Sequence, residues 1–204
     1  MTGTIQNLPG VDMLVVGASA GGVEAVGTLL EALPAGFAAP VAIVLHVPAN
    51  RPSLLADIYS RRTSLRVKEV EDKEPAMAGT VYIAPPDYHM LVEPNRLFSL
   101  SCDDAVHFSR PSIDVLFESA ALAYRDRLLG IILTGASADG AAGLTTVRRQ
   151  GGQAWVQDPD EAQARVMPLA AIAHSGTDQI LSLHDMARRL SNFSGSDSLS
   201  RTSK

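Results

Sequence analysis

Residues 13–26 read MLVVGASAGGVEAV, and this stretch decides the fold. The apolar run 13–16 predicts a buried strand, and the glycine-rich residues 17–22 predict a tight turn. Residues 23–33 predict a helix, because their apolar side chains recur at helical spacing on one face. Those side chains are Val23, Val26, Leu29, Leu30 and Leu33. A strand that turns through glycines into a helix is the repeating unit of α/β folds.

The same alternation returns along the chain. Further apolar strands are predicted at residues 41–45, 128–133, 153–156 and 179–181. Helices are predicted at residues 53–61, 112–124, 141–150, 169–174 and 185–193, with Ser53 and Ser112 as expected caps. Near-continuous apolar strands alternating with helices indicate an α/β fold with a doubly wound, mainly parallel sheet covered by helices on both faces.

The middle of the chain has a different pattern. Four short segments rich in β-branched residues are separated by glycine or proline, which predicts hairpin strands added to the main sheet. They are residues 65–70, 80–84, 89–93 and 96–100.

The length of 204 residues fits a single domain. We assign it to residues 11–193, with an N-terminal segment at residues 1–10. Residues 194–204 are rich in serine and lack periodicity, so we expect a disordered tail there.

Composition excludes several classes of protein. Apolar residues make up 46% and charged residues 19%, the balance of a soluble globular protein. A net charge of −5 argues against nucleic acid as the main partner, because neutralising phosphates requires a basic surface. The single cysteine, Cys102, cannot form an internal disulfide. With no signal-peptide pattern and no membrane-spanning apolar run, the chain is expected in the cytoplasm without membrane insertion.

The turn at residues 17–22 has competing interpretations. A dinucleotide-binding turn follows G-x-G-x-x-G, with an acid at the end of the second strand. Here Ser19 replaces the middle glycine and the second strand ends in His46, so both features argue against a nucleotide. The alternative is a G-x-S-x-G elbow at residues 17–21, which exposes the serine hydroxyl beside a helix N-terminus. A glycine-rich turn with a solvent-facing serine remains the simplest alternative.

A serine nucleophile needs a base beside it, and the chain has five histidines. Only His46 stands at the carboxyl end of a strong apolar strand. Sites of open parallel sheets form outside those ends, so the first two strand–helix units would bring His46 and Ser19 to the same edge.

The third expected group is a carboxylate that orients the imidazole. Asp139 lies in the loop 134–140, just past another buried strand, and so falls on the same edge. It could instead, or in addition, cap the helix predicted at residues 141–150. Asp114 is a rival acid, but it lies inside a helical pattern. The chain order Ser, His, Asp differs from the Ser, Asp, His order of typical α/β-hydrolases.

Together these segments resemble the catalytic domain of the chemotaxis protein-glutamate methylesterases, the CheB family. That family has G-x-S-x-G-G after the first strand, H-x-P after the second and a T-G-x-x-x-D-G loop; here these are residues 17–22, 46–48 and 134–140. Residues 81–85 with the following His89, residues 110–117 and Met167-Pro168 match further family segments, and the likeness runs in register from about residue 11 to residue 193.

The resemblance implies hydrolysis of glutamate γ-methyl esters on chemotaxis receptors, with deamidation of receptor glutamines in some members. It implies Ser19 as nucleophile, His46 as base and Asp139 as orienting acid, with no metal or organic cofactor. Ala20, Ala136 and Ser137 depart from the family's usual threonine, methionine and glycine. Backbone N–H groups of Ala20 and Ala136 could still form an oxyanion hole, since that role needs no side chain.

Two other functions remain open from sequence. One is an esterase acting on another protein or a small ester, and the other is a non-catalytic regulatory module of the same fold. Members of the family usually carry an N-terminal receiver domain, which needs on the order of a hundred residues. Because the catalytic domain is predicted to start at residue 11, we expect this chain to lack a receiver. Its active site should then be accessible without phosphorylation, or be regulated by a partner in trans.

Overall fold

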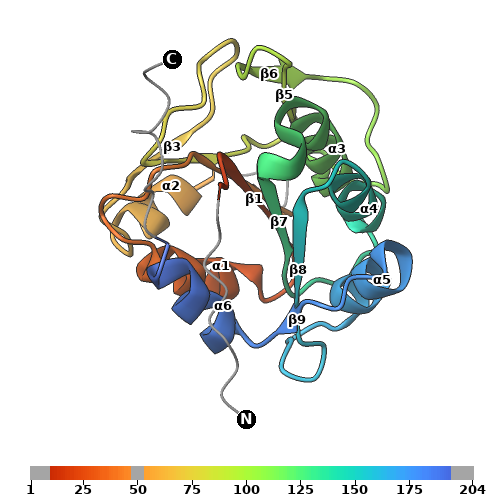
Figure 1. Cartoon of the computed structure of the whole chain (residues 1–204). Coiled ribbons are helices and arrows are strands. Elements are labelled where there is room, and N and C mark those ends of the chain that lie inside the picture. The colour runs from red at the N-terminus through yellow and green to blue at the C-terminus, as the bar shows by residue number, and fades with distance from the viewer. Residues whose placement is uncertain (1–9, 47–52, 194–204) are drawn as a thin grey trace, which may run out of the picture.

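A computed structural model describes residues 10–46 and 53–193 (Figure 1). Within them, seven strands form one parallel sheet in the order β3-β4-β2-β1-β7-β8-β9. The strands are β1 (Met13–Ala18), β2 (Val41–Leu45), β3 (Arg66–Glu69), β4 (Thr80–Ile83), β7 (Leu128–Ile132), β8 (Gln153–Gln157) and β9 (Ile180–Leu181). The expected doubly wound parallel sheet is confirmed.

Helices cover both faces of this sheet (Figure 1). One face packs against α1 (Gly22–Ala32), α2 (Leu55–Ser60) and α6 (Leu183–Ser191). The other packs against α3 (Ile113–Tyr124), α4 (Ala141–Arg149) and α5 (Val166–Ser175). A short 3-10 turn, η1 (Arg125–Arg127), joins α3 to β7.

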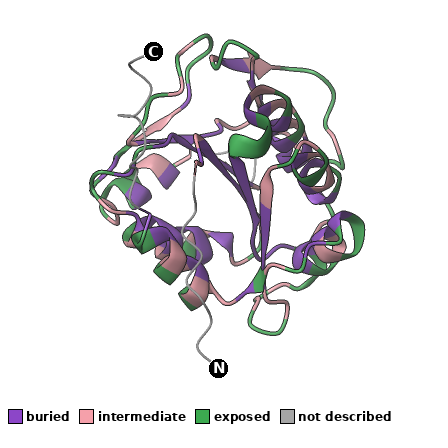
Figure 2. Ribbon diagram, viewed as in Figure 1, coloured by how far each residue is buried: buried purple, intermediate pink, exposed green. Residues whose placement is uncertain are grey.

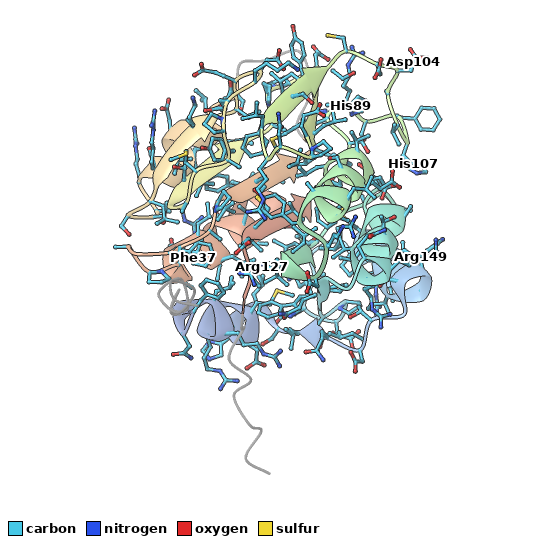
Figure 3. The ribbon with its side chains drawn as sticks, turned by 45° about the horizontal axis from the view of Figure 1, so that its top comes forward. Phe37, His89, Asp104, His107, Arg127 and Arg149 are labelled. Atoms are coloured by element: carbon cyan, nitrogen blue, oxygen red, sulfur yellow. The ribbon has the colours of Figure 1, made fainter. Side chains whose placement is uncertain are left out.

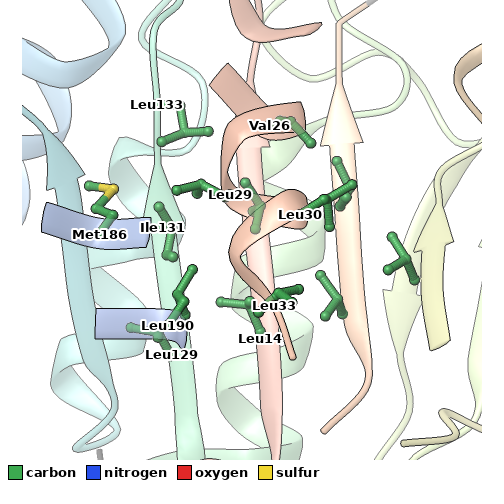
Figure 4. Packing of buried hydrophobic residues seen from close by; sticks show 14 of the residues in the cluster. Leu14, Val26, Leu29, Leu30, Leu33, Leu129, Ile131, Leu133, Met186 and Leu190 are labelled. Atoms are coloured by element: carbon green, nitrogen blue, oxygen red, sulfur yellow. The ribbon is translucent and has the colours of Figure 1, made fainter. Parts of the chain in front are cut away.

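The central strand β1 serves both layers, because successive side chains of a strand point to opposite faces. Leu14 and Val16 join the cluster beneath α1 and α6, whereas Met13 and Val15 join the cluster beneath α3 and α4. Figure 4 shows Leu14 among side chains of β7, α1 and α6, and Figure 2 shows the central strands buried. Burial on both faces explains why these strands are apolar without alternation.

The prediction of four hairpin strands in the middle of the chain is wrong for two of them. β3 and β4 are parallel members of the main sheet and extend it beyond β2. Only β5 (His89–Val92) and β6 (Phe98–Ser101) form an antiparallel hairpin, as a separate two-stranded sheet. The link between β3 and β4 contains no helix; it runs along the hairpin instead, where Phe98 N–H donates to the Glu74 carbonyl at 2.8 Å.

Several helices begin at other residues than expected; α6, for example, begins at Leu183, two residues before its predicted start. α5 begins at Val166, so Pro168 lies inside its first turn, where the N–H that proline lacks has no intrahelical partner. α2 begins at Leu55, and Ser53 Oγ accepts the Leu55 N–H at 3.3 Å.

Several sequence-based expectations fall on residues that the structure does not describe. The proposed tail 194–204, the N-terminal segment apart from Gly10, and residues 47 and 48 of the H-x-P motif lie outside the described residues. In the described part of the chain, no helix has the length and apolar character needed to cross a membrane.

Candidate active site

Ser19 stands at the turn between β1 and α1, at the carboxyl edge of the sheet. Its N–H donates to the Thr134 carbonyl at 3.0 Å, and its carbonyl accepts the Gly22 N–H at 2.8 Å. Gly21 follows with a φ of 78°, a conformation that suits glycine because it has no Cβ. The sequence GASAG therefore forms a tight strand-to-helix turn that leaves Ser19 half-buried.

The first glycine of that turn is required by packing. A Cβ at Gly17 would lie 2.4 Å from Cγ2 of Ile113, the first residue of α3. The elbow and the start of α3 are therefore in close contact.

His46 follows β2, directly beside the elbow. Its backbone N–H donates to the Ala18 carbonyl at 3.1 Å, which continues the pairing of β2 with β1 past the strand ends. The side chain of His46 is 13% exposed. Parallel pairing thus places the candidate base next to the residue that precedes Ser19.

Asp139 lies in the loop after β7 and is fully buried, with 0% exposure. Its Oδ2 accepts from His46 Nε2 at 2.8 Å and from Ile113 N–H at 2.7 Å. Its Oδ1 accepts from Ser112 Oγ at 2.8 Å and from Asp114 N–H at 3.0 Å. Four donors at the start of α3 and on His46 therefore surround one carboxylate.

These contacts determine the ionisation of Asp139. Burial raises the pKa of its carboxyl, but the hydrogen bonds from His46, Asp114, Ile113 and Ser112 outweigh burial and hold the pKa below its usual value. An ionised carboxylate only accepts hydrogen bonds, so His46 Nε2 carries the proton of this contact. In a neutral ring Nδ1 is then the free acceptor, and we assign the role of candidate base to Nδ1.

In the described residues, no hydrogen bond joins Ser19 Oγ to His46. Catalytic hydrogen bonds are often long or poorly aligned until substrate binds, so the missing bond does not exclude His46 as the base.

The loop after β7 is tied to the elbow by Thr134. Its Oγ1 donates to the Ala20 carbonyl at 2.8 Å and accepts the Ala164 N–H at 2.8 Å, and Gln157 Oε1 accepts the Thr134 N–H at 2.8 Å. Ala20 and Ala136 are exposed, and their N–H groups take part in no hydrogen bond among the described residues. Both N–H groups are therefore available to an oxyanion.

The side chain of Asp139 binds α3 and not α4. It does not cap the helix that follows it: Gly140 is the N-cap of α4, and the carboxylate of Asp139 binds the N-terminus of α3. Among the described residues, the rival Asp114 makes no hydrogen bond or ion pair with His46; its carboxylate accepts the Gly143 N–H at 2.7 Å and lies 3.4 Å from Nε2 of the exposed His107.

Sequence reasoning missed part of the site. Ser112 was expected only as a helix cap, but its hydroxyl donates to Asp139. Thr134 and Gln157 hold the loop after β7 against the elbow, and of these two only Thr134 lies in a family segment. Among the residues that the structure covers, no group of three or more His, Cys, Asp or Glu side chains could hold a metal ion.

The fold and this geometry define a doubly wound α/β domain with a serine, a histidine and an aspartate gathered where the strand order reverses beside β1. Comparison with known proteins agrees with this class. The chain belongs to the CheB methylesterase family, whose family model matches residues 14–190.

Three relatives show how far the likeness extends. A Leptospira interrogans protein named "Putative protein-glutamate methylesterase/protein-glutamine glutaminase" is 46% identical over 86% of this chain and 91% of its own length. The Myxococcus xanthus protein-glutamate methylesterase FrzG is 37% identical over 86% of this chain, but this chain spans only 52% of it. The Thermotoga maritima CheB methylesterase catalytic domain superposes with a TM-score of 0.84 at 31% identity, covering 88% of this chain and 97% of that structure.

Proposed function

We propose that this chain is a protein-glutamate methylesterase, which hydrolyses glutamate γ-methyl esters of chemotaxis receptors and uses Ser19 as its nucleophile. The observation that carries the proposal is the buried Asp139 carboxylate bound to His46 Nε2, on the edge where the elbow presents Ser19. The names of the relatives supply the substrate class.

The reaction follows from the positions of these groups. His46 Nδ1 takes the proton of Ser19 Oγ as this oxygen attacks the ester carbonyl, and the resulting imidazolium is stabilised by Asp139. The N–H groups of Ala20 and Ala136 would bind the oxyanion. Methanol leaves with the proton returned from His46, and water then cleaves the acyl-enzyme by the same steps.

A second activity is the deamidation of glutamine. A glutamine side chain differs from a glutamate γ-methyl ester only in its leaving group, so both would form the same acyl-enzyme. The Leptospira relative carries both activities in its name. Ammonia release from unmodified receptor glutamines tests this candidate.

We also place the activity in the cytoplasm. A chain with one cysteine suits a reducing compartment, and the proposed substrate belongs to a signalling system.

The main experiment measures methanol release from methylated receptor membranes. Ser19→Ala should lower the rate by on the order of a thousandfold, leaving what the oxyanion hole and binding supply. Ser60→Ala, which changes an exposed serine on α2, is the matched control and should keep the wild-type rate. If Ser19→Ala kept half of the rate, Ser19 would not be the nucleophile.

Two further measurements separate the remaining possibilities. A fluorophosphonate should label the wild type and Ser60→Ala but not Ser19→Ala; the absence of any labelling would favour a non-catalytic module. A panel of small esters would show whether receptor esters are preferred over other substrates.

A further inference from the structure

His89 is a buried histidine with no part in the mechanism above. It is the first residue of β5 and is 2% exposed. Figure 3 shows His89 on the hairpin and Asp104 on the segment that leads from β6 towards α3. The hairpin packs against α3 through Met90, Val92 and Phe98, which belong to the same apolar cluster as Leu116 and Phe117.

The two ring nitrogens of His89 have distinct partners. The backbone N–H of Ser112 donates to Nδ1 at 3.1 Å, and Nε2 lies 3.1 Å from the Asp104 carbonyl oxygen. A backbone N–H can only donate, so Nδ1 holds a lone pair. Nε2 must then carry the hydrogen and donate to the carbonyl, which makes His89 a neutral bridge between the loop after β6 and the start of α3.

The start of α3 is also where Asp139 is held. Three of the four groups that donate to its carboxylate belong to residues 112–114: the Ser112 hydroxyl and the N–H groups of Ile113 and Asp114. His89 binds the backbone N–H of Ser112, and the hydroxyl of the same serine donates to Asp139. Because the fourth donor is His46, a shift of Ser112 would move the acid relative to the base.

We propose that His89 is a positioning residue for the hydrolysis: through Ser112 it fixes the Asp139 carboxylate that orients His46. This inference rests on the proposed function, in which Asp139 acts on His46. His89 makes no hydrogen bond to Ser19 or His46 among the described residues, so its effect on the reaction passes through Asp139. Its loss should lower kcat and leave KM nearly unchanged, because orientation of the base matters most in the transition state.

Two polar substitutions separate the two bonds of the ring. His89→Asn places Oδ1 where Nδ1 stood and keeps an acceptor for the Ser112 N–H. His89→Gln places its amide near the Nε2 position and keeps a donor for the Asp104 carbonyl, but it has no acceptor at the δ position. We expect His89→Asn to keep kcat within about threefold and His89→Gln to lose roughly ten- to a hundredfold, the scale of a misplaced catalytic group.

A double-mutant cycle shows whether the loss passes through Asp139. In an Asp139→Asn background, His89→Gln should lower kcat by less than about threefold, because the oriented acid is already gone. Equal losses in both backgrounds, or a His89→Gln enzyme as active as His89→Asn, would refute the positioning role. If His89→Gln does not fold, His89→Asn alone decides: a folded variant with a tenfold loss contradicts the proposal.

A spectroscopic measurement keeps this inference separate from the proposed function. The NMR signal of the His46 Nε2 proton, which is hydrogen-bonded to Asp139, should shift in His89→Gln and stay in place in His89→Asn. An unchanged signal in His89→Gln would overturn the inference even if the enzyme is active. If instead the wild type releases no methanol, the proposed function fails while the shift still tests the link from His89 to His46.

Discussion

Asp139 shows how a buried charge can be kept in an apolar domain. Its carboxylate accepts four hydrogen bonds, and two of them come from backbone N–H groups at a helix N-terminus, where the helix dipole also favours a negative charge. An unpaired carboxylate at 0% exposure would be strongly destabilising. The same contacts that make the charge tolerable hold it in one position relative to His46.

Asp139→Asn is therefore expected to impair the reaction severely. The amide keeps the size of the side chain, but its NH2 group would meet N–H donors or fail to orient His46. We expect kcat to fall at least a hundredfold, towards the roughly ten-thousandfold seen when a triad aspartate is replaced in this way. Methanol release measures the loss. Asp12→Asn, which removes a carboxylate paired with Arg127 at the other end of β1, should keep the wild-type kcat, and a loss there would point to unfolding instead.

The three candidate catalytic residues could be predicted from the sequence because of their place at strand ends. Ser19, His46 and Asp139 each follow an apolar strand, and parallel strands bring their carboxyl ends to one edge. The partners of Asp139 could not be predicted from spacing, because Ser112 is 27 residues away in the chain and reaches it only after α3 packs on the sheet.

At the scale of elements, the elbow and α3 depend on each other through Gly17. A Cβ at this position would lie 2.4 Å from a methyl carbon of the fully buried Ile113. We expect Gly17→Ala to lower the free energy of unfolding by about 1–3 kcal/mol, as overpacking does. It should also reduce kcat, because Ile113 N–H is a donor to Asp139.

Denaturant unfolding measures the stability, and Gly36→Ala is the control. A Cβ at Gly36 would have no atom within 4 Å, so this change should be neutral or slightly stabilising. Equal stability of the two variants would show that α3 moves freely away from the elbow.

The element scale is also where sequence reasoning failed. The apolar runs of β1, β2 and β7 identified buried parallel strands, but β3 and β4 have only four residues each, the same length as the hairpin strands β5 and β6. Their parallel pairing depends on the path of the segment that connects them, residues 70–79. That segment bonds to the hairpin, as in the antiparallel bridge between Pro75 and Leu97, and such a contact leaves no local pattern in the sequence.

For the whole molecule, the carboxylates beside the N-terminus of α3 affect both the candidate site and the stability of the fold. Asp114 lies in the first turn of α3 and the Asp139 carboxylate binds that turn, and the pKa values of the two carboxyls are displaced in opposite directions. Burial raises the pKa of Asp114; the Gly143 N–H lowers it, and the charges of Asp139 and Glu118 raise it further, so the net shift is upward. The acid-induced unfolding of the domain should therefore contain two opposed contributions.

The pH dependence of stability follows from these shifts. Because the folded pKa of Asp139 lies below the unfolded value of about 3.9, its ionised form stabilises the fold above that value, and this stability is lost as the pH falls through the folded pKa. The free energy of unfolding of wild type minus that of Asp139→Asn should thus increase with pH up to about pH 5 and then stay constant. For Asp114 the folded pKa is raised, so the corresponding difference for Asp114→Asn should decrease as the pH rises from about 4. Urea titrations between about pH 3 and pH 7 measure both differences, and parallel slopes for the two variants would contradict the assignment of ionised Asp139 to the N-terminus of α3.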